Sequence, residues 1–258
     1  MRILFIGDVI GDPGRKALFA LLPGVQREYS VDVIVANGEN AAGGFGITLD
    51  TAQEILDSGV NVITSGGHIW DRKEIIPYLD GELPILRPLN YPSGVPGRGH
   101  WVRNNLLVAN AMGRVFVGTI DCPFRAMDAL LDSLDPKPSV IALDFHAEAT
   151  SEKEALAWYL DGRVSVVVGT HTHVPTADTR ILPKGTAYVT DLGKVGPVHS
   201  IIGNTPEDVL QRFLYQTPNR LGIPRGPVSF NSVLVDVDES TGKANSIERV
   251  DRTVEVHG

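Results

Sequence analysis

Short apolar runs alternate with amphipathic segments along most of the chain. The apolar runs have the length of buried strands, and they are residues 2–9, 31–37, 60–65, 139–145 and 163–170. The segments with apolar residues at helical spacing are residues 15–29, 48–59, 123–134, 150–162 and 205–216. This alternation predicts an α/β fold, in which a largely parallel sheet carries helices on its faces.

The other apolar patterns are shorter or less regular. Short strands are expected at residues 83–88, 180–182 and 186–191. Residues 101–113 predict a hairpin or two strands, whereas residues 87–100 are rich in proline and glycine and predict a loop that could carry substrate contacts. In the tail, residues 229–256, apolar and polar residues alternate on both sides of ESTGK, as they do in a β-hairpin. We therefore expect one α/β domain over residues 1–258, with its C-terminal part antiparallel.

Capping residues and prolines mark the expected helix ends. Asp12 followed by Pro13 predicts an N-cap with proline in the first helical turn. Pro23 predicts that this helix ends or bends just before it. A later helix is expected to be capped by Thr150 or Ser151.

Composition is that of an ordinary globular protein and narrows the possible partners. Hydrophobic residues make up 43% and charged residues 21% of the 258 residues. The formal net charge of −8 gives no basic footprint for a long nucleic acid. Cys122 is the only cysteine, which excludes an intramolecular disulfide and a thiolate metal cluster. Because neither a secretory signal nor an apolar membrane span is evident, we expect a cytoplasmic protein without membrane contact.

Polar residues follow the ends of the strongest predicted strands. They are Asp8, Asn37, Glu39, Asn40, His68, His146, His171 and His173. In α/β sheets, ligands bind beyond the carboxyl ends of the strands. These side chains offer oxygen and nitrogen ligands without sulfur, which suits Zn, Mn or Fe.

The segment GTHTHVPT, residues 169–176, carries the most specific local signal. Its two histidines, His171 and His173, lie two positions apart directly after a predicted strand. Metal ligation is favoured over two unrelated loop histidines, because histidine is scarce in this chain. His146 is more ambiguous, since a histidine at the edge of the core can simply bond a carbonyl group.

Other polar residues have plain structural interpretations beside the functional one. Asp8 could cap a turn, although a carboxylate beyond a buried strand is costly unless it is paired or metal-bound. Glu39 and Asn40 could belong to an ordinary loop. The remaining histidines and two arginines are interpreted as surface residues, and these are His100, His199, His257, Arg98 and Arg103.

The ordered set of motifs resembles the calcineurin-like metallophosphoesterases, and more closely their YmdB-like bacterial branch of cyclic-nucleotide phosphodiesterases. The matching stretches are FIGDVIGDPGR, GENAAGGFG, LDFHAEATSEKEA and VGTHTHVPTADTRIL. The resemblance implies a four-layer α/β/β/α sandwich with a binuclear metal centre. It further implies that Asp8, Asn40 and His173 hold the first metal ion and that Glu39 bridges both ions.

The resemblance also implies the remaining site residues. His146 and His171 would hold the second metal ion, and His68 would act as general acid near the leaving group. The family's third motif reads Gly-Asn-His, and its Asn ligates the second metal ion. Here the motif reads Gly66-Gly67-His68, so this ligand is absent and we expect weaker occupancy of the second site. Ser65 or Asn61 could compensate for the missing ligand.

The function that follows from the resemblance is metal-dependent hydrolysis of a phosphodiester, most plausibly a 2′,3′-cyclic nucleotide, with two Fe or Mn ions favoured and Zn as an alternative. A small nucleotide is then the expected partner, in a homo-oligomer. The main alternative is a weakened or inactive regulator of the same fold that binds metal or nucleotide, which Gly67 favours. A metal-dependent amidohydrolase fits less well, because its His-x-His pair usually follows the first strand. A serine hydrolase is weaker still, because the chain has no Gly-x-Ser-x-Gly motif.

Overall fold

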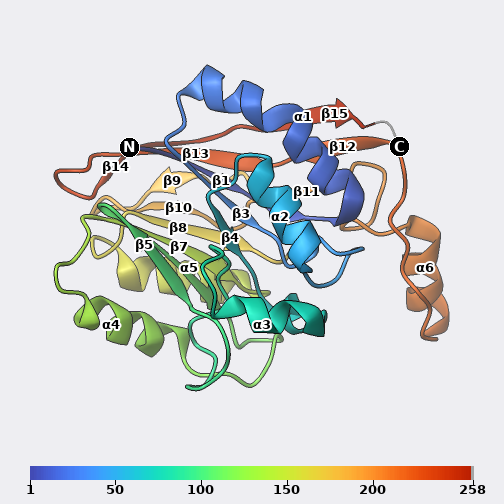
Figure 1. Cartoon of the computed structure of the whole chain (residues 1–258), viewed down its shortest axis with the longest axis horizontal. Coiled ribbons are helices and arrows are strands. Elements are labelled where there is room, and N and C mark those ends of the chain that lie inside the picture. The colour runs from blue at the N-terminus through green and yellow to red at the C-terminus, as the bar shows by residue number, and fades with distance from the viewer. Residues whose placement is uncertain (257–258) are drawn as a thin grey trace.

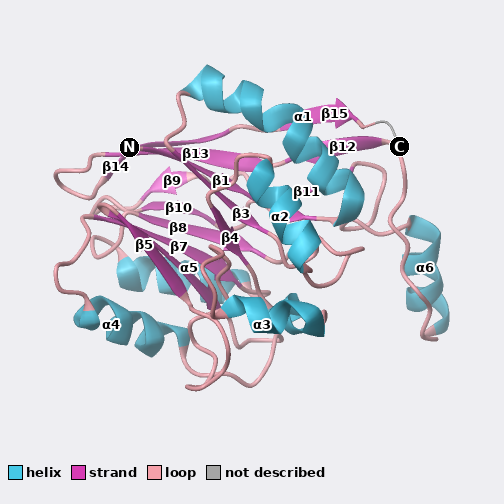
Figure 2. Ribbon diagram, in the orientation of Figure 1, coloured by secondary structure: helices cyan, strands magenta, loops and turns pink. Residues whose placement is uncertain are grey.

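Two large β-sheets lie face to face between outer layers of helices (Figure 1). The structure is a computed structural model and describes residues 1–256. Figure 2 shows the helices on the two outer faces and the strands in the middle. This arrangement confirms the α/β/β/α sandwich implied by the sequence resemblance.

The first sheet has five strands in the order β14-β13-β1-β3-β4. Its strands are β1 (Arg2–Ile6), β3 (Val33–Asn37), β4 (Val62–Thr64), β13 (Ser232–Val237) and β14 (Ala244–Arg249). The first three run parallel to one another, whereas β13 pairs antiparallel with both β1 and β14. The predicted C-terminal hairpin is thus β13–β14, and it extends the parallel sheet on one side.

The second sheet has six strands in the order β5-β6-β7-β8-β10-β9. Its strands are β5 (His100–Arg103), β6 (Leu106–Met112), β7 (Val140–His146), β8 (Val166–Thr170), β9 (Arg180–Ile181) and β10 (Ala187–Val189). The four central strands are parallel, and the two edge strands pair antiparallel with their neighbours. A smaller sheet joins β2 (Asp8–Val9), β11 (Lys194–Pro197), β12 (Pro227–Phe230) and β15 (Arg252–Glu255).

Helices cover the outer faces of both large sheets. Helices α1 (Gly11–Tyr29) and α2 (Leu49–Asp57) lie on the first sheet, and α4 (Pro123–Ser133) and α5 (Thr150–Leu160) lie on the second (Figure 1). Short turns of helix follow β4, namely η1 (Gly67–Trp70), η2 (Lys73–Ile75) and α3 (Ile76–Leu79). Helix α6 (Pro206–Tyr215) stands at the side of the sandwich. Within the described residues, no helix is both long and apolar enough to span a bilayer.

Successive side chains of a strand point to opposite faces of the sheet, so the apolar side chains divide between separate cores. On β1, Leu4 and Ile6 face the core under α1 and α2, whereas Ile3 and Phe5 face the core between the sheets. The second sheet divides its residues in the same way between that central core and the core under α4 and α5. The central core fixes the two sheets against each other, and so it sets the distances between the residues that each sheet carries.

Several helix ends differ from the sequence prediction. Asp12 is not the N-cap of α1 but lies in its first turn, after Ile10, and Pro23 lies inside the helix instead of ending it. Pro23 is on the exposed face, where water can bond the carbonyl group that proline leaves without a donor. Thr150 and Ser151 do not cap α5, because the helix begins at Thr150 after Ala149.

Two other predictions concern strand segments. Residues 83–88 do not form a regular strand and make only isolated bridges, at Ile85 and Leu86. Residues 101–113 do form the predicted hairpin, as β5 and β6. The isolated bridges tie the proline-rich loop 87–100 to β4 without extending the sheet.

Candidate metal centre

The structure brings the predicted polar residues together at one end of the sandwich, although they come from both sheets. Asp8 begins β2 shortly after the carboxyl end of β1, whereas Glu39, Asn40 and His68 follow the carboxyl ends of β3 and β4. The second sheet contributes His146 at the end of β7 and the segment containing His171 and His173 after β8. Because the parallel strands of each sheet end at the same edge, residues far apart in sequence converge there.

Glu39, His146 and His171 form the tightest cluster. The Glu39 Oε1 atom lies 2.8 Å from His146 Nε2, which lies 3.0 Å from His171 Nδ1. One ligand atom from each residue lies within 4.8 Å of those of the other two. Glu39 and His146 are both buried, with 1% exposure. A carboxylate and two imidazole nitrogens at this spacing fit a Zn, Mn or Fe ion.

Asp8, Asn40 and His173 form a second group beside the first. His173 Nε2 lies 3.5 Å from Asp8 Oδ1 and 3.2 Å from the Asn40 side-chain nitrogen. Asp8 is fully buried, and the backbone N–H of His171 donates to its other oxygen at 3.2 Å. The two groups thus lie side by side and are linked by the hydrogen bond from His171 to Asp8.

Hydrogen bonds fix which ring nitrogen of His146 and His173 faces the centre. The Thr170 hydroxyl donates to Asp144 Oδ1 at 2.7 Å, so it accepts from His146 Nδ1–H at 3.0 Å. His173 Nδ1–H donates to the Ile202 carbonyl oxygen at 2.8 Å. Nε2 is therefore the nitrogen that faces the centre in both rings, and it would become the ligand atom when a bound ion replaces its proton.

Glu148 orients the ring of His171, but it does so through Nε2 and not through Nδ1. Its Oε2 atom lies 3.0 Å from His171 Nε2, while His171 Nδ1 points to His146. The carboxylate accepts Nε2–H and leaves Nδ1 free to bind an ion. Glu148 was not predicted from the sequence, although it stands only two residues after His146 in FHAEAT. Its role depends on the ring orientation of His171, which the sequence does not give.

The pKa values within the centre follow from burial and from neighbouring charges. Burial would raise the pKa of Asp8, but the charge and hydrogen bond of His173 outweigh it and hold that pKa below its usual range. Burial likewise opposes ionisation of Glu39, yet His146 lowers its pKa. Burial disfavours the charged imidazole of His146, but Glu39 raises its pKa to about 9. Both carboxylates are therefore anionic near neutral pH, and a bound cation would replace the positive charge that His146 otherwise supplies.

His68 lies at the mouth of the centre and not inside it. Its backbone N–H donates to Glu39 Oε2 at 2.9 Å, and its ring Nδ1 lies 2.7 Å from Asp71 Oδ2. The side chain is 39% exposed, and its ring meets the edge of Phe45 at a centroid distance of 5.1 Å. Asp71 thus orients the ring and leaves Nε2 available to a bound molecule.

The two glycines before His68 have different surroundings. A Cβ atom on Gly66 would overlap the His146 ring and would come within 2.6 Å of Glu39 Oε2. At Gly67, the position of the missing asparagine, the nearest such contact is the Met112 sulfur at 3.8 Å. Gly66 is therefore needed for close approach of the backbone to the centre, whereas a side chain fits at position 67.

Neither residue expected to compensate for Gly67 is placed to do so. The Ser65 hydroxyl donates to the Leu86 carbonyl oxygen at 2.6 Å. Asn61 lies before the start of β4, at the other end of that strand, where its Oδ1 atom accepts from Ile34 N–H at 2.8 Å. The prediction that one of them replaces the missing ligand was wrong, because both side chains are bonded elsewhere.

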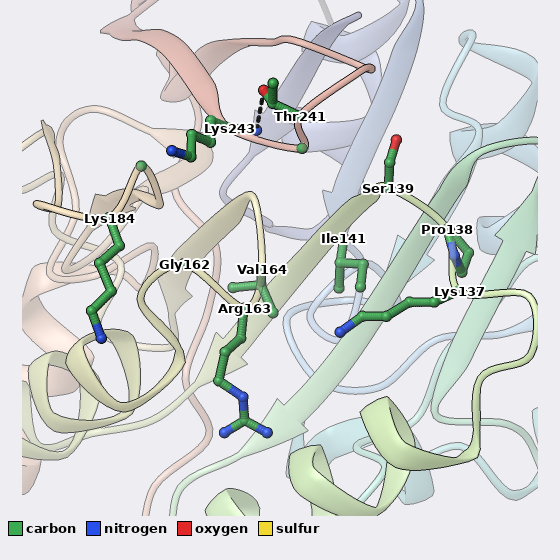
Figure 3. A pocket seen from close by; sticks show the side chains of 12 residues that line it. Lys137, Pro138, Ser139, Ile141, Gly162, Arg163, Val164, Lys184, Thr241 and Lys243 are labelled. Carbon is green, nitrogen blue, oxygen red and sulfur yellow. Dashed lines mark hydrogen bonds between the residues drawn. The ribbon is translucent and has the colours of Figure 1, made fainter.

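A cavity of about 410 Å³ opens onto the centre. Its lining includes Glu39, Asn40, His68, His171 and His173. Another cavity, of about 260 Å³, is lined by basic residues such as Lys137, Arg163, Lys184 and Lys243 and contains no histidine or carboxylate (Figure 3). Only the first of these two cavities carries the donor set of a metal centre.

The other histidines and arginines considered in the sequence lie away from the centre. His100 is half-buried in β5, so it is not the surface histidine that was predicted, and His199 is exposed as expected. His257 lies outside the described residues. Arg103 lines a different cavity, beside Trp101, and neither it nor Arg98 lines the one at the metal centre.

Comparison with known proteins gives matches over nearly the whole chain. A family model described as YmdB-like protein matches residues 4–250. A Bacillus subtilis (strain 168) protein named 2′,3′-cyclic-nucleotide 2′-phosphodiesterase is 46% identical over 254 residues, covering 97% of this chain and 96% of that protein.

Two solved structures share the whole fold. A hypothetical protein from Thermus thermophilus superposes with a TM-score of 0.92 at 44% identity, covering 98% of this chain and 99% of that one. A structure described as a novel phosphatase from Mycoplasma pneumoniae superposes with a TM-score of 0.91 at 32% identity, covering 98% and 93%. The sequence resemblance is thus confirmed over nearly the entire chain.

Proposed function

This chain belongs to the YmdB-like protein family, and on that premise we propose that it is a metal-dependent phosphodiesterase acting on 2′,3′-cyclic nucleotides. Hydrolysis of phosphoesters is the activity that its named relatives share. The observation that carries the proposal is the cluster of Glu39, His146 and His171, of which the first two are buried and whose ligand atoms lie within 4.8 Å of one another beside a cavity. Because residues from both sheets contribute, we also propose that residues 1–258 act as one domain.

Two groups of residues would hold the metal ions. Asp8, Asn40 and His173 would bind the first, with Fe or Mn favoured and Zn as an alternative. His146 and His171 would bind the second, and Glu39 would bridge the two. Ions held there supply Lewis-acid chemistry, since they neutralise charge on phosphate oxygens and make a water molecule more acidic.

The protein's own residues perform the remaining tasks. His68, held by Asp71 at 2.7 Å, is placed at the cavity mouth to give a proton to the departing ribose oxygen. Glu148 and Thr170 fix the orientation of the ligating histidine rings. The cavity lining carries two carboxylates, Glu39 and Glu148, and one arginine, Arg212, so bound cations would supply much of the positive charge that a phosphate group needs.

The test measures metal content and turnover together. Protein purified without chelator should contain transition-metal ions by elemental analysis and should hydrolyse adenosine 2′,3′-cyclic monophosphate. His68→Ala should lower kcat by about 10²- to 10⁴-fold while keeping the metal content. His199→Ala, an exposed histidine outside the cavity lining, is the matched control and should leave kcat unchanged. A fully active His68→Ala variant would show that the assigned general acid is wrong.

A catalytically inactive regulator of the same fold is the second candidate, because Gly67 leaves the second metal site without the family's asparagine. That candidate predicts binding of metal and nucleotide without turnover by the wild-type protein. The same assay therefore separates the two candidates.

We also propose that the protein acts in the cytoplasm as a homo-oligomer. Helix α6 supports self-association, because Phe213, Leu214 and Tyr215 expose 78%, 71% and 69% of their surfaces. The lone cysteine, Cys122, suits a reducing compartment. Light scattering on the wild type and on Phe213→Ser would test the self-association, and a wild-type monomer would contradict it.

A further inference from the structure

The cavity at the metal centre continues onto an apolar wall that the proposed hydrolysis does not use. Phe45, Ile202 and Leu221 line this part of the cavity. Phe45 is 37% exposed and Ile202 is 47% exposed, so both present apolar surface to the cavity. A ligand site commonly combines apolar walls with a few polar groups that fix orientation. The wall therefore indicates that the substrate has a flat or apolar part beside its phosphate.

The backbone at Ile202 is held in an unusual conformation. Its φ angle is +47°, in the left-handed region that β-branched residues rarely adopt. Ile201 and Asn204 close the turn with two backbone hydrogen bonds of 2.9 and 3.0 Å. The Ile202 carbonyl accepts the bond from His173. The same strained turn thus places the Ile202 side chain at a fixed position relative to the metal ligands, and such strain is found at ligand sites.

Phe45 is fixed beside the proposed general acid, His68. Its carbonyl oxygen accepts from Arg72 Nε at 3.2 Å, and it stands between Gly44 and Gly46, which have φ angles of +97° and +79°. Its ring meets His68 in an edge arrangement, with 66° between the planes. This orientation leaves the ring partly exposed at the cavity.

We propose that Phe45 and Ile202 form a subsite for the nucleobase of the substrate. The proposal rests on the phosphodiesterase function proposed above and names the part of the substrate that this wall recognises. Stacking on an aromatic ring is tolerant of base identity, because every base has a π-face. The enzyme should therefore accept cyclic nucleotides with different bases and should discriminate against a cyclic phosphodiester that has no base.

The experiment compares two substrates that share the same reacting group. Adenosine 2′,3′-cyclic monophosphate carries a base, whereas glycerol 1,2-cyclic phosphate has the five-membered cyclic phosphodiester alone. Phe45→Ala should lower kcat/KM for the adenosine substrate by about 10-fold and leave that for the glycerol substrate within about twofold. Ile202→Ala should act in the same direction, because it removes apolar surface from the proposed subsite. The turn should be kept, since alanine fits a left-handed conformation better than a β-branched residue does. Phe116→Ala, which removes a 90% exposed ring outside the cavity lining, is the matched control.

Equilibrium binding gives a second readout that does not depend on turnover. Calorimetry with adenosine 3′-monophosphate should show about 10-fold weaker binding to Phe45→Ala at unchanged metal content. An equal loss on both substrates would overturn the subsite and would assign Phe45 to the support of His68. If the wild type cleaves neither substrate, the phosphodiesterase proposal fails, and the binding measurement alone then decides whether the base contacts this wall.

Discussion

A single methyl group at Gly66 should disrupt the metal centre, whereas the same change at Gly67 should be harmless. The Cβ atom of Gly66→Ala would stand within 2.6 Å of Glu39 Oε2 and would overlap the His146 ring. Both of those side chains are 1% exposed, so neither can swing out into solvent. At Gly67 the nearest contact of the added Cβ is at 3.8 Å.

The size of the effect follows from these distances. Ordinary contact begins at 3.4 Å, so Glu39 must retreat by the difference between 3.4 and 2.6 Å, or about 0.8 Å. Overpacking of this kind costs about 1–3 kcal/mol of folding stability. A displacement near 1 Å at a catalytic centre costs about 10²-fold in rate. We therefore expect Gly66→Ala to lose about 100-fold in kcat and to bind metal more weakly.

The assay measures three quantities for each alanine variant: metal ions per chain, kcat on a 2′,3′-cyclic nucleotide, and the free energy of unfolding in urea. Gly67→Ala should match the wild type in all three. The reasoning is refuted if Gly66→Ala keeps the metal content of the wild type and a kcat within twofold of it. Equal losses at Gly66 and Gly67 would also refute it, because a shared backbone effect would then explain them.

Three further substitutions test other parts of the site. Gly67→Asn should tighten the second metal ion in a chelator competition, and an unchanged affinity would show that the missing asparagine does not limit binding. Glu148→Ala should weaken metal binding by about 10- to 100-fold, because His171, a proposed ligand, loses the acceptor that orients its ring; normal affinity would show that Glu148 does not support the site. Lys153→Met should cost about 3–5 kcal/mol in urea unfolding, because it leaves the fully buried Asp191 carboxylate without its partner at 2.7 Å. Arg180→Met breaks an exposed ion pair and is the control, expected to cost less than about 1 kcal/mol.

Helix positions were predictable from the sequence wherever a local signal dominates. Thr48 caps α2 with its own side chain, so the predicted start of that helix is correct within one residue. The end of β7 was also predictable within one residue, because the apolar run 139–145 stops beside His146. The prediction failed at Pro23, because α1 continues through it with Leu22 and Val25 packed in the core while the proline lies on the exposed face.

The candidate metal ligands were predictable from the sequence, but the residues that hydrogen-bond to their rings were not. The motifs that resemble the family contain the candidate metal ligands and give their order along the chain. Glu148 and the Thr170–Asp144 pair gave no comparable signal, because a hydrogen bond to a ring nitrogen depends on how that ring is turned. Ile202 was likewise unpredictable, since nothing local favours a β-branched residue in a left-handed turn.

The sequence by itself determined the alternation of strands and helices, the set of oxygen and nitrogen donors, and the absence of thiolate ligands. Only the tertiary structure decided that Glu39 from one sheet lies 2.8 Å from His146 of the other. That distance is set by apolar packing between the sheets, where residues such as Phe5 and Val168 meet. Such packing sums many contacts between residues distant in sequence, so no single motif encodes it.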